Sequence, residues 1–459
     1  MTTKDTGTWS NWAGNQTATP HAVHRPGTAG EIGDIVRAAA SSGRTVRPLG
    51  AGHSFTPVAV TDGLRVQLDE MSGLLSVDKD ASGHVTVTLR AGTRLRDVPG
   101  LLRPRGLALA NQGDVDPQSL AGAISTGTHG TGLGFTGFAG MVRGFRIVGA
   151  DGVERRCDAS SGGEAGEIFR LATLGLGMFG VITEVTLSAV PAFHLAADER
   201  AEDFDEVRTT FAERVRHTDH MEFYWFPGTD TALVKENTRI RDHDVPAWLA
   251  GHADDGFRRP GRATRALSGF SDEVINNAGL LGVCELSRRV PSLTRRLNDF
   301  AARTVSERRY IDEAHEVFVS PRRVRFREME YGIPLETLPD VLDEIRTTID
   351  RNRAWVSFPL EIRAAAADYV PLSTAYGRES AYVAVHRYHR EPYREYFALI
   401  EPILKAAGGR PHWGKLHTLT NADLRERYPL FDEVADLRRR VDPDGVFLND
   451  HLRELFDPA

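Results

Sequence analysis

The chain has 459 residues, of which 41% are hydrophobic, 26% charged and 8% aromatic. This composition excludes wholesale disorder, a collagen-like repeat and a coiled coil, and the length favours two domains or one large composite fold. With 56 lysines and arginines against 63 aspartates and glutamates, the net charge is −7. We therefore expect the chain as a whole to show no attraction to nucleic acid or anionic lipid.

Cysteine usage and the lack of long apolar runs indicate the compartment. Cys157 and Cys284 are the two cysteines of the sequence, too few and too far apart for a disulfide framework or a structural zinc site. Residues 1–12 are polar and no run of about 18 apolar residues occurs, so neither a secretion signal nor a membrane span is expected. The histidines are scattered without metal-ligand spacing. The sequence thus predicts a cytoplasmic protein without a metal.

The first expected element is a helix over residues 28–41, where apolar residues recur at helical spacing and Thr28 can cap the N-terminus. A short strand over residues 44–49 runs into the sequence Gly-Ala-Gly-His-Ser-Phe at residues 50–55. Its glycines require a tight, exposed backbone. This loop is therefore a candidate binding segment.

The remaining part of the first 190 residues mixes strands with helices. A second segment rich in glycine and threonine, residues 113–134, is expected to form a loop. The alternation and turn residues predict strands at 64–68, 84–90, 144–148, 153–157 and 181–190, and helices at 95–103 and 164–174. The mixture indicates an α+β fold.

Residues 235–310 are rich in arginine, interspersed with acids and with Gly/Pro breaks. We expect a solvated helical surface there, because no aromatic residues interleave to stack bases. The arginines concerned are Arg258, Arg259, Arg288, Arg289, Arg295, Arg296, Arg308 and Arg309.

The segment Gly175 to Gly180 fits the pattern G-x-G-x-x-G. A dinucleotide fingerprint of the Rossmann type needs a strand before this pattern and a helix after it. Here the order is reversed, since a helical pattern precedes it and a β-branched strand follows. We therefore interpret it as a tight turn.

Two other glycine-rich segments can cradle a pyrophosphate. Residues 50–55 and residues 121–132 are both rich in unhindered backbone N–H groups and small hydroxyls, which bind phosphate without a lysine. Two such loops could clamp one dinucleotide. For His53 and His129 taken alone, a histidine hydrogen-bonded in a turn is the favoured interpretation.

Candidate catalytic residues lie near the C-terminus. Glu361 and Arg363 are two apart in an extended segment and so point to the same face of a strand. A surface ion pair would explain them equally well. Lys415 follows Trp413 and Gly414, which suggests a buried, close-packed approach, although an ordinary surface lysine is the alternative.

Taken together, these segments resemble FAD-linked oxidoreductases of the vanillyl-alcohol oxidase type, in the sugar-lactone and alditol oxidase branch. Residues 50–55 resemble the pyrophosphate loop whose histidine carries the flavin through a covalent 8α bond. The segment 121–132 resembles the other FAD loop, and 174–183 the glycine turn and strand near the adenosine. Residues 361–363 and 412–415 resemble the Glu-x-Arg and His-Trp-x-Lys motifs. The matches follow the family's order.

The resemblance implies an FAD-binding domain of the PCMH type, built of two subdomains, over residues 14–191. An α+β cap domain for the substrate would follow over 192–410, and residues 411–459 would return to the FAD domain. The implied cofactor is FAD, covalent through His53, with further contacts from Pro48, Leu49, Gly50, Ala51, Gly52, Ser54, Gly113, Asp114, Ser119, Gly122, Ser125, Thr126, Thr128, His129, Ile182 and His412.

The implied reaction is oxidation of a hydroxyl on a sugar 1,4-lactone of the L-gulono or D-arabinono type, with alditol oxidation as the alternative. Lys415 would be the base that takes the hydroxyl proton. We expect burial and the nearby positive Arg363 to lower its pKa, so that a neutral amine is accessible. Arg363 would stabilise negative charge on the flavin, and Glu361 would orient Arg363 and accept a substrate hydroxyl.

The electron acceptor depends on Gly113. In the resembling family this position lies against the oxygen-reactive carbon of the flavin and is alanine in some dehydrogenases. A glycine leaves room for oxygen, so we expect an oxidase rather than a dehydrogenase with another acceptor. The alternative is a turn glycine with positive φ before Asp114.

Two other classes of protein stay open at this stage. A nicotinamide dehydrogenase would need one of the glycine motifs to open a helix. A non-enzymatic nucleic-acid-binding or sugar-binding protein would use the arginine-rich segment. A bound flavin in the purified protein would separate both from a flavoenzyme.

Overall fold

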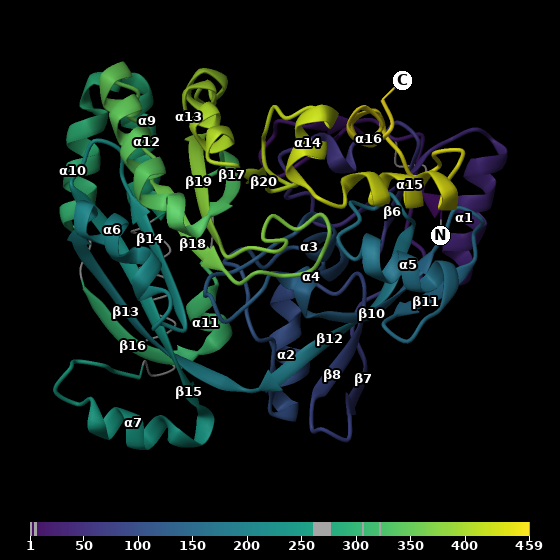
Figure 1. The fold of residues 1–459 in the computed structure, drawn as a ribbon, viewed down its shortest axis with the longest axis horizontal. Helices are drawn as coiled ribbons and strands as arrows, with labels where there is room; N and C mark the ends of the chain where they lie inside the picture. The colour runs from purple at the N-terminus through teal and green to yellow at the C-terminus, as the bar shows by residue number, and fades with distance from the viewer. Residues whose placement is uncertain (1, 4–6, 260–276, 305–306, 321–322, 459) are drawn as a thin grey trace.

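The computed structural model describes residues 2–3, 7–259, 277–304, 307–320 and 323–458. Figure 1 shows an N-terminal half on one side of the molecule and a large second domain on the other. None of the helices in the described ranges has both the length and the hydropathy needed to cross a bilayer. Part of the arginine-rich stretch, residues 260–276, lies outside the described residues.

The first subdomain is a four-stranded sheet in the order β1-β4-β6-β5, in which β4, β6 and β5 run parallel. The expected helix over residues 28–41 is confirmed as α1, capped by the Thr28 side chain, which accepts a hydrogen bond from the backbone N–H of Glu31. The elements are β1 (Thr2–Thr3), β4 (Ala22–His24), α1 (Ala29–Ser41), β5 (Val46–Leu49) and β6 (Leu64–Gln67). A small hairpin of β2 (Trp9–Ser10) and β3 (Thr17–Ala18) lies between β1 and β4 in the chain.

The second subdomain is a six-stranded sheet in the order β11-β10-β12-β8-β7, with β9 paired to β12. The strand β7 was not expected, because it is an edge strand whose Leu75 and Val77 are exposed rather than alternating with a buried face. The strands are β7 (Leu74–Lys79), β8 (Val85–Arg90), β9 (Leu107–Ala108), β10 (Val142–Val148), β11 (Glu154–Asp158) and β12 (Val181–Pro191). The helices are α2 (Val98–Leu102), flanked by 3-10 turns, α4 (Phe138–Met141) and α5 (Gly163–Ala172).

One expectation for this half was wrong. Residues 113–134 are not a loop throughout, because α3 (Leu120–Thr126) forms inside them. Ser119 caps this helix by accepting from the N–H of Gly122, and Gly127 ends it with φ +81°. Leu120, Ala123 and Ile124 are buried on its inner face. Packing of these three outweighs the low helix propensity of Gly122, Ser125 and Thr126.

The second domain is an eight-stranded sheet in the order β16-β13-β15-β14-β18-β19-β17-β20. Figure 1 shows α9, α10 and α12 on the outer side of this sheet, away from the N-terminal half. The strands are β13 (Phe193–Asp203), β14 (His220–Trp225), β15 (Thr231–Arg241), β16 (Arg308–Glu313), β17 (Phe326–Pro334), β18 (Leu360–Ala365), β19 (Ser380–Tyr388) and β20 (Arg410–Pro411). The helices are α6 (Phe204–Arg214), α7 (Val245–Gly251), α9 (Asn277–Arg289), α10 (Thr294–Thr304), α11 (Ala314–Phe318), α12 (Leu338–Asn352) and α13 (Arg394–Ala406).

The arginine-rich segment behaves as a solvated surface where it is described. Seven of the eight arginines named above are exposed, and Arg308 is half-buried. Four large apolar side chains on or beside α9 and α10 are also exposed: Leu281, Leu286, Val290 and Phe300.

The C-terminal segment packs against the N-terminal half, where Figure 1 shows it in yellow. It contains α14 (Asn421–Arg427), α15 (Phe431–Val441) and α16 (Asp450–Phe456). The N–H of Val46 donates to the carbonyl oxygen of Val446 at 2.7 Å. The buried guanidinium of Arg47 donates to the carbonyl oxygen of Phe447 at 2.6 Å. These bonds tie the segment to β5, directly before the glycine loop. The boundaries at residues 191 and 410 stay predictions.

Candidate active site

Two clefts meet at the loop that follows β5. The first has an empty volume of about 980 Å³ and the second about 800 Å³. His53, Ser54, Gln118 and Thr126 line both. The clefts therefore adjoin at these residues, so the two parts of an elongated ligand would lie on either side of His53.

The first cleft gathers most of the residues predicted to hold FAD. The ones that line it are Pro48, Leu49, Gly50, Ala51, Gly52, His53, Ser54, Ser119, Gly122, Ser125, Thr126 and Ile182. A Cβ atom at Gly50 would overlap the hydroxyl of Ser119, and Gly52 has φ +70° with the Trp9 indole close by. Side chains at these glycines would close the cradle, so the residues present fit a dinucleotide held by backbone groups.

The glycine turn at residues 175–180 contributes to the same cleft. It follows α5 and leads into β12, so the Rossmann interpretation is excluded as expected. Leu176 and Gly177 have positive φ of 52° and 69°, and both line the cleft with Gly180. A Cβ on Gly177 would lie 3.0 Å from the ring of Pro48. The turn thus packs closely against the end of β5.

The second cleft brings together the residues predicted for catalysis. They come from β18, from the segment after β20 and from the loops around α3. The predicted residues that line it are Gly113, Asp114, Thr128, His129, Glu361, Arg363, His412 and Lys415, besides His53, Ser54 and Thr126.

Arg363 is held by three carboxylates. Its Nε lies 2.9 Å from Glu222 and one terminal nitrogen lies 3.3 Å from Asp114, while the same nitrogen contacts Glu361. Burial alone would lower the pKa of Arg363, but Glu361, Glu222 and Asp114 raise it well above its usual value. Glu361 and Arg363 are 5% and 8% exposed, so the alternative of a surface ion pair was wrong.

A partly buried lysine lies next to the carboxylates that hold Arg363. Lys235 on β15 lies 3.2 Å from the carboxylate of Glu222. The hydroxyl of Tyr224 lies 3.1 Å from an oxygen of Glu222 and from one of Glu361. The network fixes the orientation of the guanidinium.

Lys415 differs from the sequence-based expectation. Its Nζ contacts Glu328 and lies 3.8 Å from Glu330, both on β17. Burial lowers the pKa of Lys415, but the two carboxylates outweigh burial and raise it above the usual value. The predicted neutral amine was therefore wrong, since the sequence did not show which acids reach the lysine. Because its side chain is 21% exposed and lines the cleft, it is not an ordinary surface lysine.

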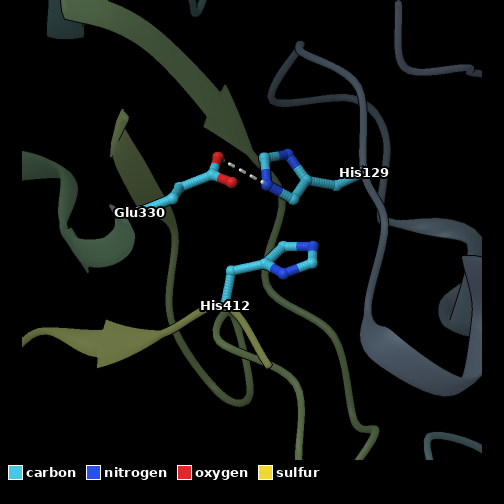
Figure 2. Close-up of side chains that lie close together, drawn as sticks. All are labelled: His129, Glu330 and His412. Atoms are coloured by element: carbon cyan, nitrogen blue, oxygen red, sulfur yellow. Dashed lines mark ion pairs between the residues drawn. The ribbon is translucent and has the colours of Figure 1, made fainter. Parts of the chain in front are cut away.

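His129, Glu330 and His412 form a buried cluster that the scattered sequence positions did not suggest (Figure 2). Their ligand atoms lie within 4.8 Å of one another, a set that could hold a metal ion. His412 Nδ1, however, accepts from the N–H of Gly414 at 3.0 Å, which leaves its hydrogen on Nε2. The ammonium of Lys415 also lies 3.8 Å from Glu330. The Lys415 ammonium thus already supplies a positive charge beside Glu330. The cluster is better described as an ion pair between His129 and Glu330 at 3.1 Å.

His53 lies where the two clefts meet. Burial, together with the positive charges of Lys415 and Arg94, lowers the pKa of His53 to about 4. Its imidazole is therefore neutral near pH 7 and stacks on Trp12 with ring centroids 5.5 Å apart. His53 thus lines both clefts, and the choice between a flavin-bearing histidine and a simple turn histidine stays a prediction.

Gly113 does not have the positive φ that a turn glycine would need, so that alternative was wrong. A Cβ atom there would lie 2.8 Å from the carbonyl oxygen of His129. The glycine therefore allows two stretches of backbone to approach closely in the wall of the second cleft.

Several residues of the second cleft escaped the sequence analysis. Glu328 and Glu330 alternate along β17 in the same i, i+2 pattern as Glu361 and Arg363, which was the available signal. The sequence held no signal for His386 or Trp12. The place of His386 depends on strand pairing, and that of Trp12 depends on the packing of the N-terminal hairpin. The missed residues that line the cleft are Trp12, Phe55, Val115, Gln118, Phe326, Glu328, Glu330, His386 and Gly414.

Comparison with known proteins agrees with this architecture. A family model described as D-arabinono-1,4-lactone oxidase matches residues 185–455, and one described as FAD binding domain matches residues 20–158. The chain is 39% identical to L-gulono-1,4-lactone dehydrogenase of Mycobacterium tuberculosis, over 98% of this chain and 99% of that protein. It is 33% identical to alditol oxidase of a Streptomyces species, over 98% and 99%.

A solved structure supports the fold. Cholesterol oxidase from B. sterolicum superposes with a TM-score of 0.77 over 98% of this chain and 96% of that one, at 17% sequence identity. The FAD-binding fold of the PCMH type and its α+β class are thereby confirmed. The flavin match also removes the nicotinamide alternative. The chain belongs to the D-arabinono-1,4-lactone oxidase family of FAD-dependent oxidoreductases.

Proposed function

We propose that the protein oxidises the hydroxyl beside the carbonyl of a sugar 1,4-lactone, of the L-gulono or D-arabinono type. The observation that carries this proposal is the convergence of Glu361, Arg363, Lys415 and His53 on one cleft that adjoins the candidate dinucleotide cleft. The family match and the relative named L-gulono-1,4-lactone dehydrogenase support the lactone as substrate.

FAD, when bound, supplies the acceptor for the hydride that leaves the substrate carbon. Pro48 to Ser54, the first turn of α3 and Gly177 would hold it in the first cleft, with His53 at the junction. Arg363 offers guanidinium N–H donors beside Asp114 and Glu361, and it keeps a permanent positive charge where negative charge develops.

The carboxylates of the second cleft suit a polyhydroxy substrate. Glu361 and Glu328 are buried acceptors that can receive hydrogen bonds from sugar hydroxyls. The ammonium of Lys415, held by Glu328, can donate to the oxygen of the reacting hydroxyl. Closure of such a site around the sugar excludes water from the charged groups and strengthens their interactions.

Three finer points belong to the same proposal. His53 carries FAD covalently, supported by its neutral imidazole at the junction of the clefts. Molecular oxygen is the acceptor of the reduced flavin, supported by Gly113 in the wall of the second cleft. The protein works in the cytoplasm, supported by two buried cysteines that are not paired with each other.

Alditol oxidation is the second candidate, favoured by the 33% identity to alditol oxidase over almost the whole chain. The two differ in whether the substrate is a ring or an open chain. Anaerobic mixing of the purified yellow protein with L-gulono-1,4-lactone, D-arabinono-1,4-lactone, xylitol or sorbitol decides between them. We expect a lactone to bleach the flavin absorbance at a lower substrate concentration than a polyol. The reverse order would favour alditol oxidation.

A further inference from the structure

Glu328 lines the second cleft, and the mechanism expected from the sequence assigns it no part in the proton transfer. It lies on β17, is 5% exposed and lines the cleft. One carboxylate oxygen contacts Lys415 Nζ, and the other lies 3.6 Å from Nε2 of His386. Nδ1 of His386 lies 3.0 Å from the carbonyl oxygen of Pro359, which can only accept. Nδ1 therefore carries a hydrogen, and Nε2 faces the carboxylate.

This arrangement changes how a hydroxyl proton can leave the substrate. An ammonium has no lone pair, so Lys415 cannot accept a proton while it keeps all three of its own. The carboxylate of Glu328, in direct contact with that ammonium, has free lone pairs. The proton can move only if one proton of Lys415 is handed on to Glu328.

We propose that Glu328 is the terminal acceptor of the substrate hydroxyl proton and that Lys415 relays it. The proposal rests on the function given above. The substrate O–H proton passes to Lys415 Nζ as a proton already on Nζ passes to Glu328. The C–H bond breaks with its electron pair, which leaves as hydride to FAD, and the carbon–oxygen bond becomes a carbonyl. Lys415 ends as an ammonium and Glu328 as a carboxylic acid, with His386 next in line.

The surrounding charges are part of the argument, because they also act on this pair. Glu330 from the same strand lies 3.8 Å from Lys415 and is itself paired with His129. The other titratable or charged groups that face the cleft are Asp114, His53, Glu361, Arg363, His386 and His412. Among these, Arg363 is neutralised by its own three carboxylates. Glu328 is therefore the carboxylate that decides the charge of Lys415.

The relay and a simple lysine base predict opposite effects of one substitution. Glu328→Gln removes the negative charge and keeps the shape, so burial lowers the pKa of Lys415 and makes its neutral amine easier to form. If Lys415 were the base by itself, substrate reduction of the flavin would become faster near pH 7. If Glu328 is the terminal acceptor, reduction becomes slower, because the proton has nowhere to go.

The first measurement is the charge of Lys415. The chain contains five lysines, at positions 4, 79, 235, 405 and 415, so the side-chain resonances of ¹³C-labelled lysine in the holoenzyme are few. Lys415→Arg assigns the signal. We expect Lys415 to titrate at lower pH in Glu328→Gln than in the parent, and Glu330→Gln to shift it less. An unchanged titration in Glu328→Gln would overturn the proposal.

The second measurement is anaerobic flavin reduction across the pH range. We expect Glu328→Gln to be about tenfold slower or more at pH 7, with a rate that rises with pH as the free amine forms. Glu328→Asp should restore a large part of the rate. A faster Glu328→Gln would overturn the relay. If no lactone or alditol reduces the parent flavin, the proposed function fails, while the lysine resonance still decides whether Glu328 holds the ammonium.

Discussion

The indole of Trp12 stacks on the imidazole of His53 at an interplanar angle of 27°. Trp12 also donates its backbone N–H to the carbonyl of Gly52 at 2.9 Å, and its ring meets Phe326 edge-on at 5.1 Å. The N-terminal hairpin thus reaches across the loop that carries the candidate flavin attachment site. Stacking restricts the rotation of the imidazole ring and so limits the directions in which its free nitrogen can point.

The first prediction is that His53 bears the flavin. After acid denaturation and gel filtration, yellow colour should stay with the parent polypeptide and leave it completely in His53→Ala. A neutral imidazole is the nucleophilic form, and the lowered pKa of about 4 keeps it neutral at pH 7. Full release of FAD from the parent would rule out the covalent bond.

The second prediction concerns Trp12. We expect Trp12→Ala to lower the covalently bound fraction of flavin at least about twofold, because the imidazole loses its stacking partner, while non-covalent FAD still binds. In-gel flavin fluorescence against total flavin absorbance measures the fraction. Trp248→Ala is the matched control, since Trp248 stacks on His252 at 4.0 Å in the second domain. An equal loss in both variants would indicate general destabilisation.

The third prediction tests the guanidinium of Arg363. An ammonium cannot satisfy Asp114, Glu222 and Glu361 together in a planar arrangement, so Arg363→Lys should slow anaerobic flavin reduction about 100-fold. Flavin content should change little. Arg103→Lys serves as the control, because Arg103 pairs with Asp242 at 3.1 Å outside both clefts. A rate in Arg363→Lys within a few-fold of the parent would refute the assignment.

The fourth prediction is a pH dependence of stability. His220 is fully buried, its Nδ1 lies 2.7 Å from the carbonyl oxygen of Thr131, and its Nε2 accepts from Arg239 at 2.9 Å. Burial, then the charge of Arg239, lowers the pKa of His220 to about 3. As pH falls, His220 therefore takes up a proton in the unfolded chain at a higher pH than in the folded protein. The free energy of unfolding decreases as pH falls from about 6.5 towards 3.

The measurement is denaturant unfolding at pH 7 and pH 5. His220 should contribute up to about 2 kcal/mol to the decrease in stability between these values. His220→Asn cannot titrate, so its decrease should be smaller by that amount, although its stability at pH 7 falls as well. The exposed His21 offers the control, and His21→Asn should keep the parent's pH dependence. An undiminished decrease in His220→Asn would contradict the prediction.

Local signals predicted the site residues whose places depend on short segments. The glycine loop at residues 50–55 follows a recognisable strand, and strand alternation alone puts Glu361 and Arg363 on one face. All of the residues predicted to contact FAD or substrate line one of the two clefts. Most of this list came from the resemblance to the flavoenzyme family, whose motifs occur in the same order along this chain.

The charge of the site could not be predicted in the same way. Lys415 meets Glu328 only because β20 and the segment after it pair with β17. Arg363 meets Glu222 because β18 pairs with β14. Registers between strands so distant in sequence depend on the whole sheet, so the partners of a charged residue, and with them its pKa, follow only from the folded structure.

The last prediction returns to Gly113. A methyl group there would lie 2.8 Å from the carbonyl oxygen of His129, so Gly113→Ala forces two loop segments of the cleft wall apart, at a cost of about 1–3 kcal/mol. We expect a lower melting temperature together with reoxidation by oxygen at least about tenfold slower, and artificial dyes still accepted. Gly134→Ala is the control, because a Cβ atom there meets no atom within 4 Å.

The separate readouts decide what the glycine does. Slow reoxidation with near-parental substrate reduction would support access of oxygen at this point, whereas equal losses in flavin content, reduction and reoxidation would show that Gly113 serves only the packing against His129. The reaction of the parent's reduced flavin with oxygen must be measured as well, because the relative from Mycobacterium tuberculosis is named a dehydrogenase. Sluggish reaction of the parent's reduced flavin with oxygen would therefore contradict the oxidase proposal, whatever the variants do.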